Sequence, residues 1–215
     1  MSTTPRIAVV DYGAGNLRSV AKALLRSGLE PEVTADPAAV RAAQAVVLPG
    51  VGAFADAVSN LREKGLAEAV LASIEVGRPY LGICLGLQVL FDESEEHGRT
   101  QGLGLLSGRV ERFAERDAAG SPLRVPHIGW NRVVFEGSHP MCARMPREGC
   151  FYFVHSYRAV PAQAWLRVGC ADYGGEFAAA IALDNVFAVQ FHPEKSQSAG
   201  KRLLDAFAGW VASCA

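Results

Sequence analysis

The segment that decides the fold is Pro79-Tyr80-Leu81-Gly82-Ile83-Cys84-Leu85-Gly86-Leu87-Gln88-Val89-Leu90-Phe91. Its first part, residues 79–83, is a short apolar run after a Gly-Arg-Pro break, which is typical of a buried strand. Residues 85–91 then follow the apolar spacing of a helix. Cys84 is therefore predicted at a corner where a buried strand passes directly into a helix.

Glycines stand two residues before and two residues after Cys84, in the pattern G-x-C-x-G. This is the thiol version of the G-x-S-x-G turn that presents a nucleophile. The partial positive charge at a helix N-terminus favours thiolate over thiol, and the backbone N–H of Leu85 is free to bind an oxyanion. An inert buried cysteine between two packing glycines would give the same five residues, so both interpretations stay open at this point.

A second segment, Gln190-Phe191-His192-Pro193-Glu194, ends the apolar run 186–191. Pro193 cannot continue a strand ladder, so His192 is expected where the strand gives way to a loop. Residues two apart in extended chain project to the same side, so Glu194 can reach one imidazole nitrogen while the other faces a thiol. A strand-end histidine beside a surface glutamate is the alternative for this segment alone.

The remaining histidines do not indicate a metal site. His97 and His139 lie in polar stretches and are expected to be solvated, whereas His127 and His155 lie in apolar surroundings and are expected in the core or in an interface. None has metal-ligand spacing to another histidine or cysteine, so no metal and no cofactor are predicted.

A third segment, Pro49-Gly50-Val51-Gly52-Ala53-Phe54, follows the apolar run 45–48. The carboxyl ends of parallel strands are where α/β folds place ligands. Gly50 and Gly52 let the backbone approach a substrate closely, and this loop could supply a second oxyanion donor beside Leu85. Read alone, it is also compatible with a simple glycine turn.

The rest of the chain predicts an α/β fold formed by one domain over residues 1–215. The first half alternates strands and helices, which implies an open, mostly parallel sheet with helices on both faces. Strands are expected at 6–10, 31–35, 46–48 and 79–83, and helices from Leu17 to Gly28, from Pro37, and over 54–76 with a break near Gly65. After Gly98, short pieces rich in Val, Phe and Gly predict antiparallel additions, and residues 199–211 predict a closing amphipathic helix.

Composition excludes several classes of protein. The chain has 215 residues, of which 50% are hydrophobic and 20% charged, and a net charge of −1. Nothing in this balance suggests a nucleic-acid or membrane surface, and residues 1–6 lack the layout of a signal peptide. The 5 cysteines are odd in number and irregularly spaced, as expected for a reduced, cytoplasmic protein with a free thiol. A dinucleotide site at Gly13-Ala14-Gly15 is disfavoured because Arg18 stands where the third glycine should be.

Together the segments around Cys84, His192 and Glu194 resemble the class I (triad) glutamine amidotransferases, whose fold is flavodoxin-like. Further stretches match the branch of that family that serves histidine biosynthesis: 11–16 (DYGAGN), 49–54 (PGVGAF), 102–104 (GLG), 128–131 (IGWN), 152–157 (YFVHSY) and 190–196 (QFHPEKS). Most other members carry P-G-G where this chain has P-G-V-G. One departure is Leu87, where the branch more often has Met, a change that conserves volume.

The resemblance implies hydrolysis of L-glutamine, with Cys84 as nucleophile, His192 as acid and base, and Glu194 orienting His192. It implies that Leu85 and the Gly50–Val51 loop bind the oxyanion, that a flip of this loop peptide switches activity, and that no cofactor takes part. The expected glutamine contacts are Gly52, Gln88, Ser156 and Tyr157.

The resemblance also implies a heterodimer with a (β/α)8-barrel cyclase that receives the ammonia. Expected interface residues are Asn16, Arg18, Trp130 and Lys195, although Trp130 could equally be a packing residue. Three other interpretations remain open from the sequence: a glutaminase for a different synthase, a non-catalytic binding subunit of the same fold, and a cysteine peptidase or esterase.

Overall fold

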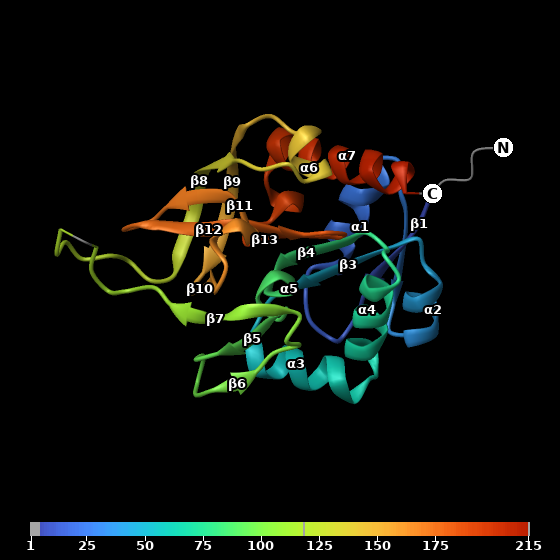
Figure 1. The fold of residues 1–215 in the computed structure, drawn as a ribbon, viewed down its shortest axis with the longest axis horizontal. Helices are drawn as coiled ribbons and strands as arrows, with labels where there is room; N and C mark the ends of the chain where they lie inside the picture. The colour runs from blue at the N-terminus through green and yellow to red at the C-terminus, as the bar shows by residue number, and fades with distance from the viewer. Residues whose placement is uncertain (1–4, 118, 215) are drawn as a thin grey trace.

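A computed structural model describes residues 5–117 and 119–214. The prediction that residues 1–6 are not a signal peptide falls in part on residues 1–4, which lie outside the described residues. The described residues form a nine-stranded sheet in the order β2-β1-β3-β4-β13-β12-β11-β8-β9 (Figure 1). Strands β2, β1, β3, β4 and β13 pair in parallel, whereas β13, β12, β11, β8 and β9 pair antiparallel. The predicted α/β fold is confirmed, and the antiparallel additions extend the same sheet.

The first half alternates strands and helices as the sequence predicts. Its elements are β1 (Arg6–Val10), α1 (Leu17–Arg26), β2 (Glu30–Thr34), α2 (Pro37–Ala42), β3 (Ala45–Gly50), α3 (Phe54–Glu63), α4 (Leu66–Glu75), β4 (Tyr80–Cys84) and α5 (Leu85–Gln88). Asn16 caps α1, since the N–H of Ser19 donates to its Oδ1 at 3.4 Å. Gly65 separates α3 from α4 with a φ of 65°, as expected from the predicted break.

The second half adds short strands and closes with a long helix. Its elements are β5 (Phe91–Ser94), β6 (Thr100–Gln101), β7 (Leu106–Arg112), β8 (His127–Phe135), α6 (Pro140–Ala143), β9 (Glu148–His155), β10 (Tyr157–Pro161), η1 (Ala164–Leu166), β11 (Arg167–Asp172), β12 (Glu176–Leu183), β13 (Val186–Val189), η2 (Pro193–Lys195) and α7 (Gln197–Ser213). A second, four-stranded sheet has the order β10-β7-β5-β6, and β6 contacts α3.

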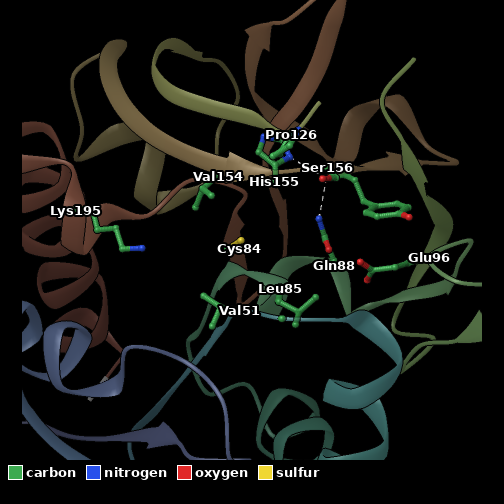
Figure 2. A pocket seen from close by; sticks show the side chains of 12 residues that line it. Val51, Cys84, Leu85, Gln88, Glu96, Pro126, Val154, His155, Ser156 and Lys195 are labelled. Atoms are coloured by element: carbon green, nitrogen blue, oxygen red, sulfur yellow. Dashed lines mark hydrogen bonds between the residues drawn. The ribbon is translucent and has the colours of Figure 1, made fainter. Parts of the chain in front are cut away.

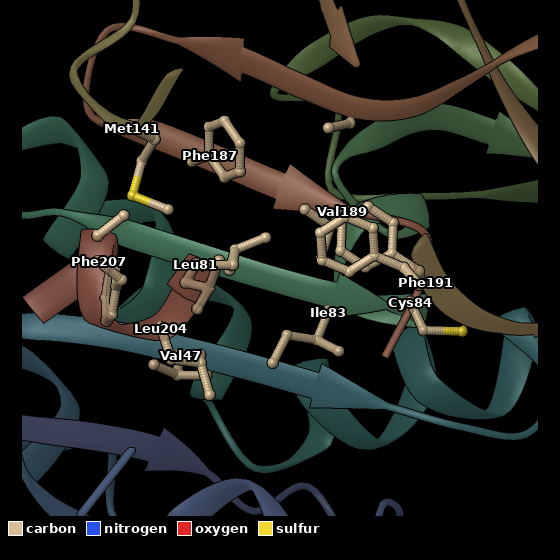
Figure 3. Close-up of a cluster of buried hydrophobic side chains, with 14 of the residues drawn as sticks. Val47, Leu81, Ile83, Cys84, Met141, Phe187, Val189, Phe191, Leu204 and Phe207 are labelled. Atoms are coloured by element: carbon tan, nitrogen blue, oxygen red, sulfur yellow. The ribbon is translucent and has the colours of Figure 1, made fainter. Parts of the chain in front are cut away.

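Two apolar clusters lie on opposite faces of the main sheet. One packs α1, α6 and α7 on the sheet, and the other packs α2, α3 and α4 on it (Figure 1). Within α7, Leu203, Phe207 and Trp210 are all buried, as the amphipathic pattern predicts. Figure 3 shows the first cluster reaching along β4 and β13 to Cys84, at the end of the buried strand. The helices on both faces therefore hold the strand ends that carry the candidate site.

The helix predicted over 85–91 is wrong in its second half. Helix α5 ends at Gln88, and Phe91 begins β5. The backbone carbonyl of Val89 accepts from the N–H of Leu103 at 2.8 Å, and that of Leu90 accepts from Leu105 and Leu106 at 2.9 Å. These long-range bonds satisfy the carbonyls that a longer helix would have used.

The prediction for His139 is also wrong, because this side chain is half-buried rather than solvated. Its ring lies edge-on to Trp210 at 4.8 Å and close to Phe187 at 5.3 Å, and its Nε2 contacts the backbone oxygen of Asp184 at 3.0 Å. Burial lowers the pKa of His139 from its ordinary value. His97 is exposed, as predicted.

Candidate active site

Three strand ends meet at one edge of the sheet. Gly50 at the end of β3 lies opposite Cys84 at the end of β4, and Val189 at the end of β13 lies opposite Ile83. The segment from Gln190 onward therefore leaves the sheet beside Cys84. The structure thus brings together the three segments that the sequence singles out, at the carboxyl edge where α/β folds place ligands.

Cys84 occupies a strained corner that requires small neighbours. Its φ is 55° and its ψ is −105°, a conformation that L-residues rarely adopt. A Cβ on Gly86 would lie 1.8 Å from the backbone oxygen of Leu48, and one on Gly82 would lie 2.6 Å from that of Gly86. Only glycine at these two positions lets α5 start against β3, which places the thiol above the strand ends.

His192 is held by Glu194 at the end of the neighbouring strand. Nδ1 of His192 and Oε1 of Glu194 are 2.9 Å apart, and both side chains are buried. The N–H at Nδ1 therefore donates a hydrogen bond to the carboxylate, and Nε2 is the nitrogen left to react. Nε2 makes no hydrogen bond among the described residues, so it is free to exchange a proton with a reacting group.

The charge environment favours protonated His192. Burial lowers the pKa of this imidazole, but the nearby Cys84 and Glu194 outweigh burial and raise the pKa to about 9. Because negative charge on Cys84 stabilises the imidazolium, the two groups are placed so that they can act as a nucleophile and an acid. A carboxylate behind the imidazole completes the arrangement used for acyl transfer by thiols.

The backbone of His192 is anchored by Ser196, which the sequence reasoning missed. The hydroxyl of Ser196 donates to the backbone oxygen of His192 at 2.6 Å and accepts from the N–H of Tyr152 at 3.0 Å. The N–H of His192 in turn donates to the backbone oxygen of Tyr152 at 2.9 Å. These bonds fix the backbone of His192 relative to β9. The one sequence signal for Ser196 is that it is the last residue of the stretch 190–196 (QFHPEKS).

A pocket of about 450 Å³ opens over Cys84 (Figure 2). Figure 2 shows the thiol near its centre, Val51 and Leu85 on one side, and Pro126, Val154 and His155 on the opposite side. Of the residues predicted from the sequence, the pocket is lined by Val51, Gly52, Cys84, Leu85, Gln88, Ser156, Tyr157 and Lys195. Gly50 is buried and does not line the pocket.

Glu96 also lines the pocket and was missed. One of its carboxylate oxygens accepts the backbone N–H of Phe54, at the start of α3, at 2.6 Å. The partial positive charge of a helix N-terminus attracts a carboxylate, so this contact holds Glu96 in a fixed place at the pocket. In the sequence, Glu96 stands in the charged run 92–97, which gives no signal that separates it from solvated neighbours.

Side-chain amides connect the thiol to the pocket wall. Nε2 of Gln190 donates to Sγ of Cys84 at 3.6 Å, and Nε2 of Gln88 donates to Oε1 of Gln190 and to the backbone oxygen of Tyr157, both at 2.9 Å. Gln88 therefore lies next to the nucleophile, and its amide is oriented by these bonds. Gln190 is a further residue that the sequence reasoning did not assign to the site.

His127 and His155 form a buried pair, and His155 also lines the pocket; their burial agrees with the expectation that they lie in the core or in an interface. Nδ1 of His155 donates to the backbone oxygen of Tyr157 at 2.8 Å, so Nε2 of His155 accepts from Nδ1 of His127 at 3.0 Å. Burial lowers the pKa of His127 to about 4 and that of His155 to about 3. Both rings are thus neutral at neutral pH and act as fixed hydrogen-bonding groups.

The four predicted interface residues lie outside the catalytic centre. Asn16, Arg18 and Lys195 are exposed. Trp130 is 48% exposed, so it is not a core residue, and its ring lies edge-on to Tyr152 at 6.1 Å. The ammonium group of Lys195 lies 5.8 Å from the centre of the same Tyr152 ring. Trp130 and Lys195 therefore both lie near the ring of Tyr152, and Lys195 also lines the pocket.

The described part of the chain shows neither a metal-binding cluster nor a helix that could span a membrane. Within residues 5–117 and 119–214, no group of three or more His, Cys, Asp or Glu side chains is placed to hold a metal ion. Across the same residues, no helix has both the length and the apolar character needed to cross a bilayer.

Comparison with known proteins identifies a family. The family model described as glutamine amidotransferase class-I matches residues 8–208. A protein of Methylococcus capsulatus described as imidazole glycerol phosphate synthase subunit HisH is 53% identical over 209 residues, covering 95% of this chain and 96% of the relative. A protein of Syntrophotalea carbinolica with the same description is 50% identical over 202 residues, covering 94% and 98%.

Solved structures share the fold at low identity. The structure of PurLQS from Thermotoga maritima aligns with a TM-score of 0.73 at 22% identity, covering 97% of this chain and 99% of the other. The glutaminase domain of Trypanosoma brucei CTPS with bound acivicin aligns with a TM-score of 0.69 at 18% identity, covering 98% and 94%. At these identities the likeness concerns the fold alone.

Proposed function

The chain belongs to the class I glutamine amidotransferase family and, within it, to the imidazole glycerol phosphate synthase glutaminase subunits, and from this premise we propose that Cys84, His192 and Glu194 hydrolyse L-glutamine to glutamate and ammonia for histidine biosynthesis. The observation that carries the proposal is the buried Nδ1–Oε1 contact of 2.9 Å between His192 and Glu194, beside a thiol at the base of a pocket.

In the first half-reaction, the thiolate of Cys84 attacks the side-chain carbonyl carbon of glutamine, and the carbonyl oxygen becomes an oxyanion. His192, protonated on Nε2, gives its proton to the leaving nitrogen, so the C–N bond breaks, ammonia leaves and a γ-glutamyl thioester remains. In the second half-reaction, His192 takes a proton from water. The hydroxide attacks the thioester, glutamate leaves, and the thiolate is restored.

The oxyanion needs two donors that do not move during the reaction. The N–H of Leu85 lies in the first turn of α5, where backbone donors have no partner within the helix. The second donor is the N–H of Val51, delivered by the loop after Gly50. Losing one such donor typically costs about 2.7–4 kcal/mol of transition-state stabilisation, so the loop alone can switch the rate.

Glutamine is held by charge and by backbone groups at the pocket wall. The carboxylate of Glu96 binds the α-ammonium group, since it is the acidic side chain lining the pocket and its position is fixed by Phe54. Gly52, Gln88, Ser156 and Tyr157 surround the remaining backbone atoms and the amide of the substrate. This arrangement selects an amino acid that carries a free amine, which a peptide-cleaving enzyme would not require.

The ammonia passes to a partner subunit, because ammonia that reaches water at neutral pH is mostly protonated and loses its nucleophilicity. The partner is a (β/α)8-barrel cyclase in a heterodimer with this chain. It adds the ammonia to a phosphoribulosyl-formimino aminoimidazole carboxamide ribotide and releases imidazole glycerol phosphate and aminoimidazole carboxamide ribotide. The exposed Asn16, Arg18, Trp130 and Lys195 form the contact surface.

The chain acts as a single domain, and the reaction needs no cofactor, since every proton and nucleophile in it comes from Cys84, His192 or water. We place it in the cytoplasm, where a reducing environment keeps a catalytic thiol free. The cysteines are free among the described residues, which agrees with that environment.

The test is glutamate release from glutamine, measured for the chain alone and with the barrel cyclase and its nucleotide ligand. Strong stimulation in the full mixture is expected, and Cys84→Ala should abolish turnover while leaving the melting temperature close to that of the unmodified chain. Activity that does not respond to this cyclase would assign the chain to another synthase. A complete absence of activity would favour a non-catalytic binding subunit.

A further inference from the structure

One buried polar group beside the catalytic centre has no role in the reaction described above. Tyr12 follows β1 in the stretch 11–16 (DYGAGN) and is only 2% exposed. Its hydroxyl has no hydrogen-bond partner among the described residues. Burying a hydroxyl without a partner typically costs about 1–3 kcal/mol, so such a group calls for an explanation.

The hydroxyl of Tyr12 lies directly against the loop that supplies the oxyanion donor. A Cβ on Gly50 would come 2.4 Å from Oη of Tyr12 and 2.8 Å from Cβ of Leu85. Oη is therefore packed on the Cα of Gly50, next to the residue that supplies the first donor. Glycine at position 50 is what leaves space for the phenol oxygen.

The other buried tyrosine of this cluster shows that an unpartnered hydroxyl is not a general property of the region. The hydroxyl of Tyr80 donates to the backbone oxygen of Gly86 at 2.7 Å. Both phenols lie in the same apolar cluster, yet only the Tyr12 hydroxyl retains an unused proton among the described residues. The difference follows from what each oxygen faces, a helix carbonyl for Tyr80 and the Gly50–Val51 peptide for Tyr12.

The Gly50–Val51 peptide turns its N–H toward Tyr12 in this structure. Burial and the negative charge of Cys84 raise the pKa of Tyr12 far above its ordinary value, and the backbone N–H of Val51, directed at the phenol oxygen, opposes them. The phenol therefore keeps its proton. The hydroxyl of Tyr12 has no hydrogen-bond partner among the described residues, so the N–H of Val51 does not satisfy it.

Rotation of this peptide would exchange the positions of its two polar groups. The N–H of Val51 would turn into the pocket, where the oxyanion forms, and the carbonyl of Gly50 would turn toward Oη of Tyr12. The flanking Gly52 has a φ of 103°, in the region that glycine adopts freely, so the loop can follow the rotation. The proton of the Tyr12 hydroxyl would then have an acceptor.

We propose that Tyr12 is a positioning residue that stabilises the catalytic orientation of the Gly50–Val51 peptide, by donating a hydrogen bond to the carbonyl of Gly50 when the N–H of Val51 faces the oxyanion. This inference rests on the proposed glutaminase function. Because the phenol makes this hydrogen bond in only one of the two loop orientations, the bond shifts the equilibrium toward that orientation.

The test compares Tyr12→Phe with the unmodified chain, both alone and in the complex with the barrel cyclase and its nucleotide ligand. Losing one neutral hydrogen bond from the catalytic orientation should lower kcat of the lone chain about three- to tenfold, and kcat of the complex by the same factor or less. KM for glutamine should stay within about twofold, because the bond acts on the loop and not on the substrate.

Two further measurements separate positioning from packing. Alkylation of Cys84 by iodoacetamide forms no oxyanion, so its rate should be unchanged in Tyr12→Phe. The melting temperature should be unchanged or higher, because the substitution removes a buried hydroxyl that has no partner in the resting state. Tyr173→Phe is the matched control: its hydroxyl donates to the backbone oxygen of Arg124 at 2.6 Å, and its loss should leave kcat within about twofold.

An unchanged kcat in Tyr12→Phe would overturn the inference. So would a parallel fall of kcat, alkylation rate and melting temperature, which would indicate a packing role. An unmodified complex that releases no glutamate would instead refute the proposed function, and this outcome is visible before any variant is compared.

Discussion

Replacing Gly86 by alanine tests whether the close contact between α5 and β3 places the nucleophile. The new Cβ would lie 1.8 Å from the backbone oxygen of Leu48, whereas real Cβ contacts essentially never fall below 3.0 Å. The start of α5 must therefore move by at least about 1.2 Å, because a β3 carbonyl inside the main sheet cannot yield easily. Cys84 and Leu85 are attached to that helix start and must move with it.

A displacement of about 1 Å at a reacting group can lower the rate about 100-fold, so kcat of Gly86→Ala in the stimulated complex should fall by roughly that factor. Overpacking should also destabilise the fold by about 1–3 kcal/mol. The assay is glutamate release with saturating cyclase and nucleotide, together with thermal unfolding of the lone chain.

Gly209→Ala is the matched control, since the same methyl group is added at an exposed position of α7 with its nearest neighbour, Nε of Arg144, 3.6 Å away. This control should gain about 0.5–1 kcal/mol of stability from helix propensity and keep its kcat. If Gly86→Ala retained full kcat in a folded protein, the geometric role of the α5–β3 contact would be refuted.

The remaining predictions concern charge. Against the effect of burial, Cys84 and Glu194 raise the pKa of His192 to about 9, so kcat should fall above about pH 9, and Glu194→Gln should move this limb to lower pH; an unmoved limb would contradict the role of Glu194. Glu96→Gln keeps an oxygen for the Phe54 N–H but loses the charge, so KM for glutamine should rise about 10- to 100-fold with little change in kcat, and an unchanged KM would exclude the ammonium contact. Burial lowers the folded-state pKa of His127 and His155 to about 4 and about 3, so their contribution to stability is full above pH 6.5 and lost as pH falls toward those values, at up to about 1.4 kcal/mol per pH unit per histidine. Urea unfolding between pH 7 and 4 measures this slope, and a flat profile would show that the histidines take up protons without unfolding.

The sequence predicts the frame of the site because that frame depends on local patterns. A buried run that ends in Gly82, Cys84 and Gly86 can be recognised as a strand-to-helix corner, and the structure has that corner. His192 at a strand end, with Glu194 two residues on, follows in the same way from the position of Pro193. In each case the geometry depends on neighbours within a few residues.

What the sequence does not predict depends on contacts between distant segments. Glu96 becomes a pocket residue only because the first N–H of α3, that of Phe54, binds its carboxylate. The hydroxyl of Tyr12 is distinguished only by its contact with Gly50, which lies far away in the sequence. The helix predicted over 85–91 extends too far because every residue there is buried, so no polar face marks where the helical period stops. His139 was misplaced because polar neighbours in the sequence do not reveal the aromatic rings that cover it.

The place of β13 in the main sheet has a consequence for the order in which this protein matures. β13 lies between β4 and β12 in the sheet, and it pairs directly with β4, the strand that ends at Cys84. Yet β13, which leads to His192, is among the last segments of the chain to be synthesised. Pairings between residues far apart in sequence are slow to form. When β4 has left the ribosome and β13 has not yet been made, the nascent chain therefore carries the Cys84 thiol without His192. Ammonia production must wait until the residues from β13 onward have been made, which couples the first turnover to completion of the fold.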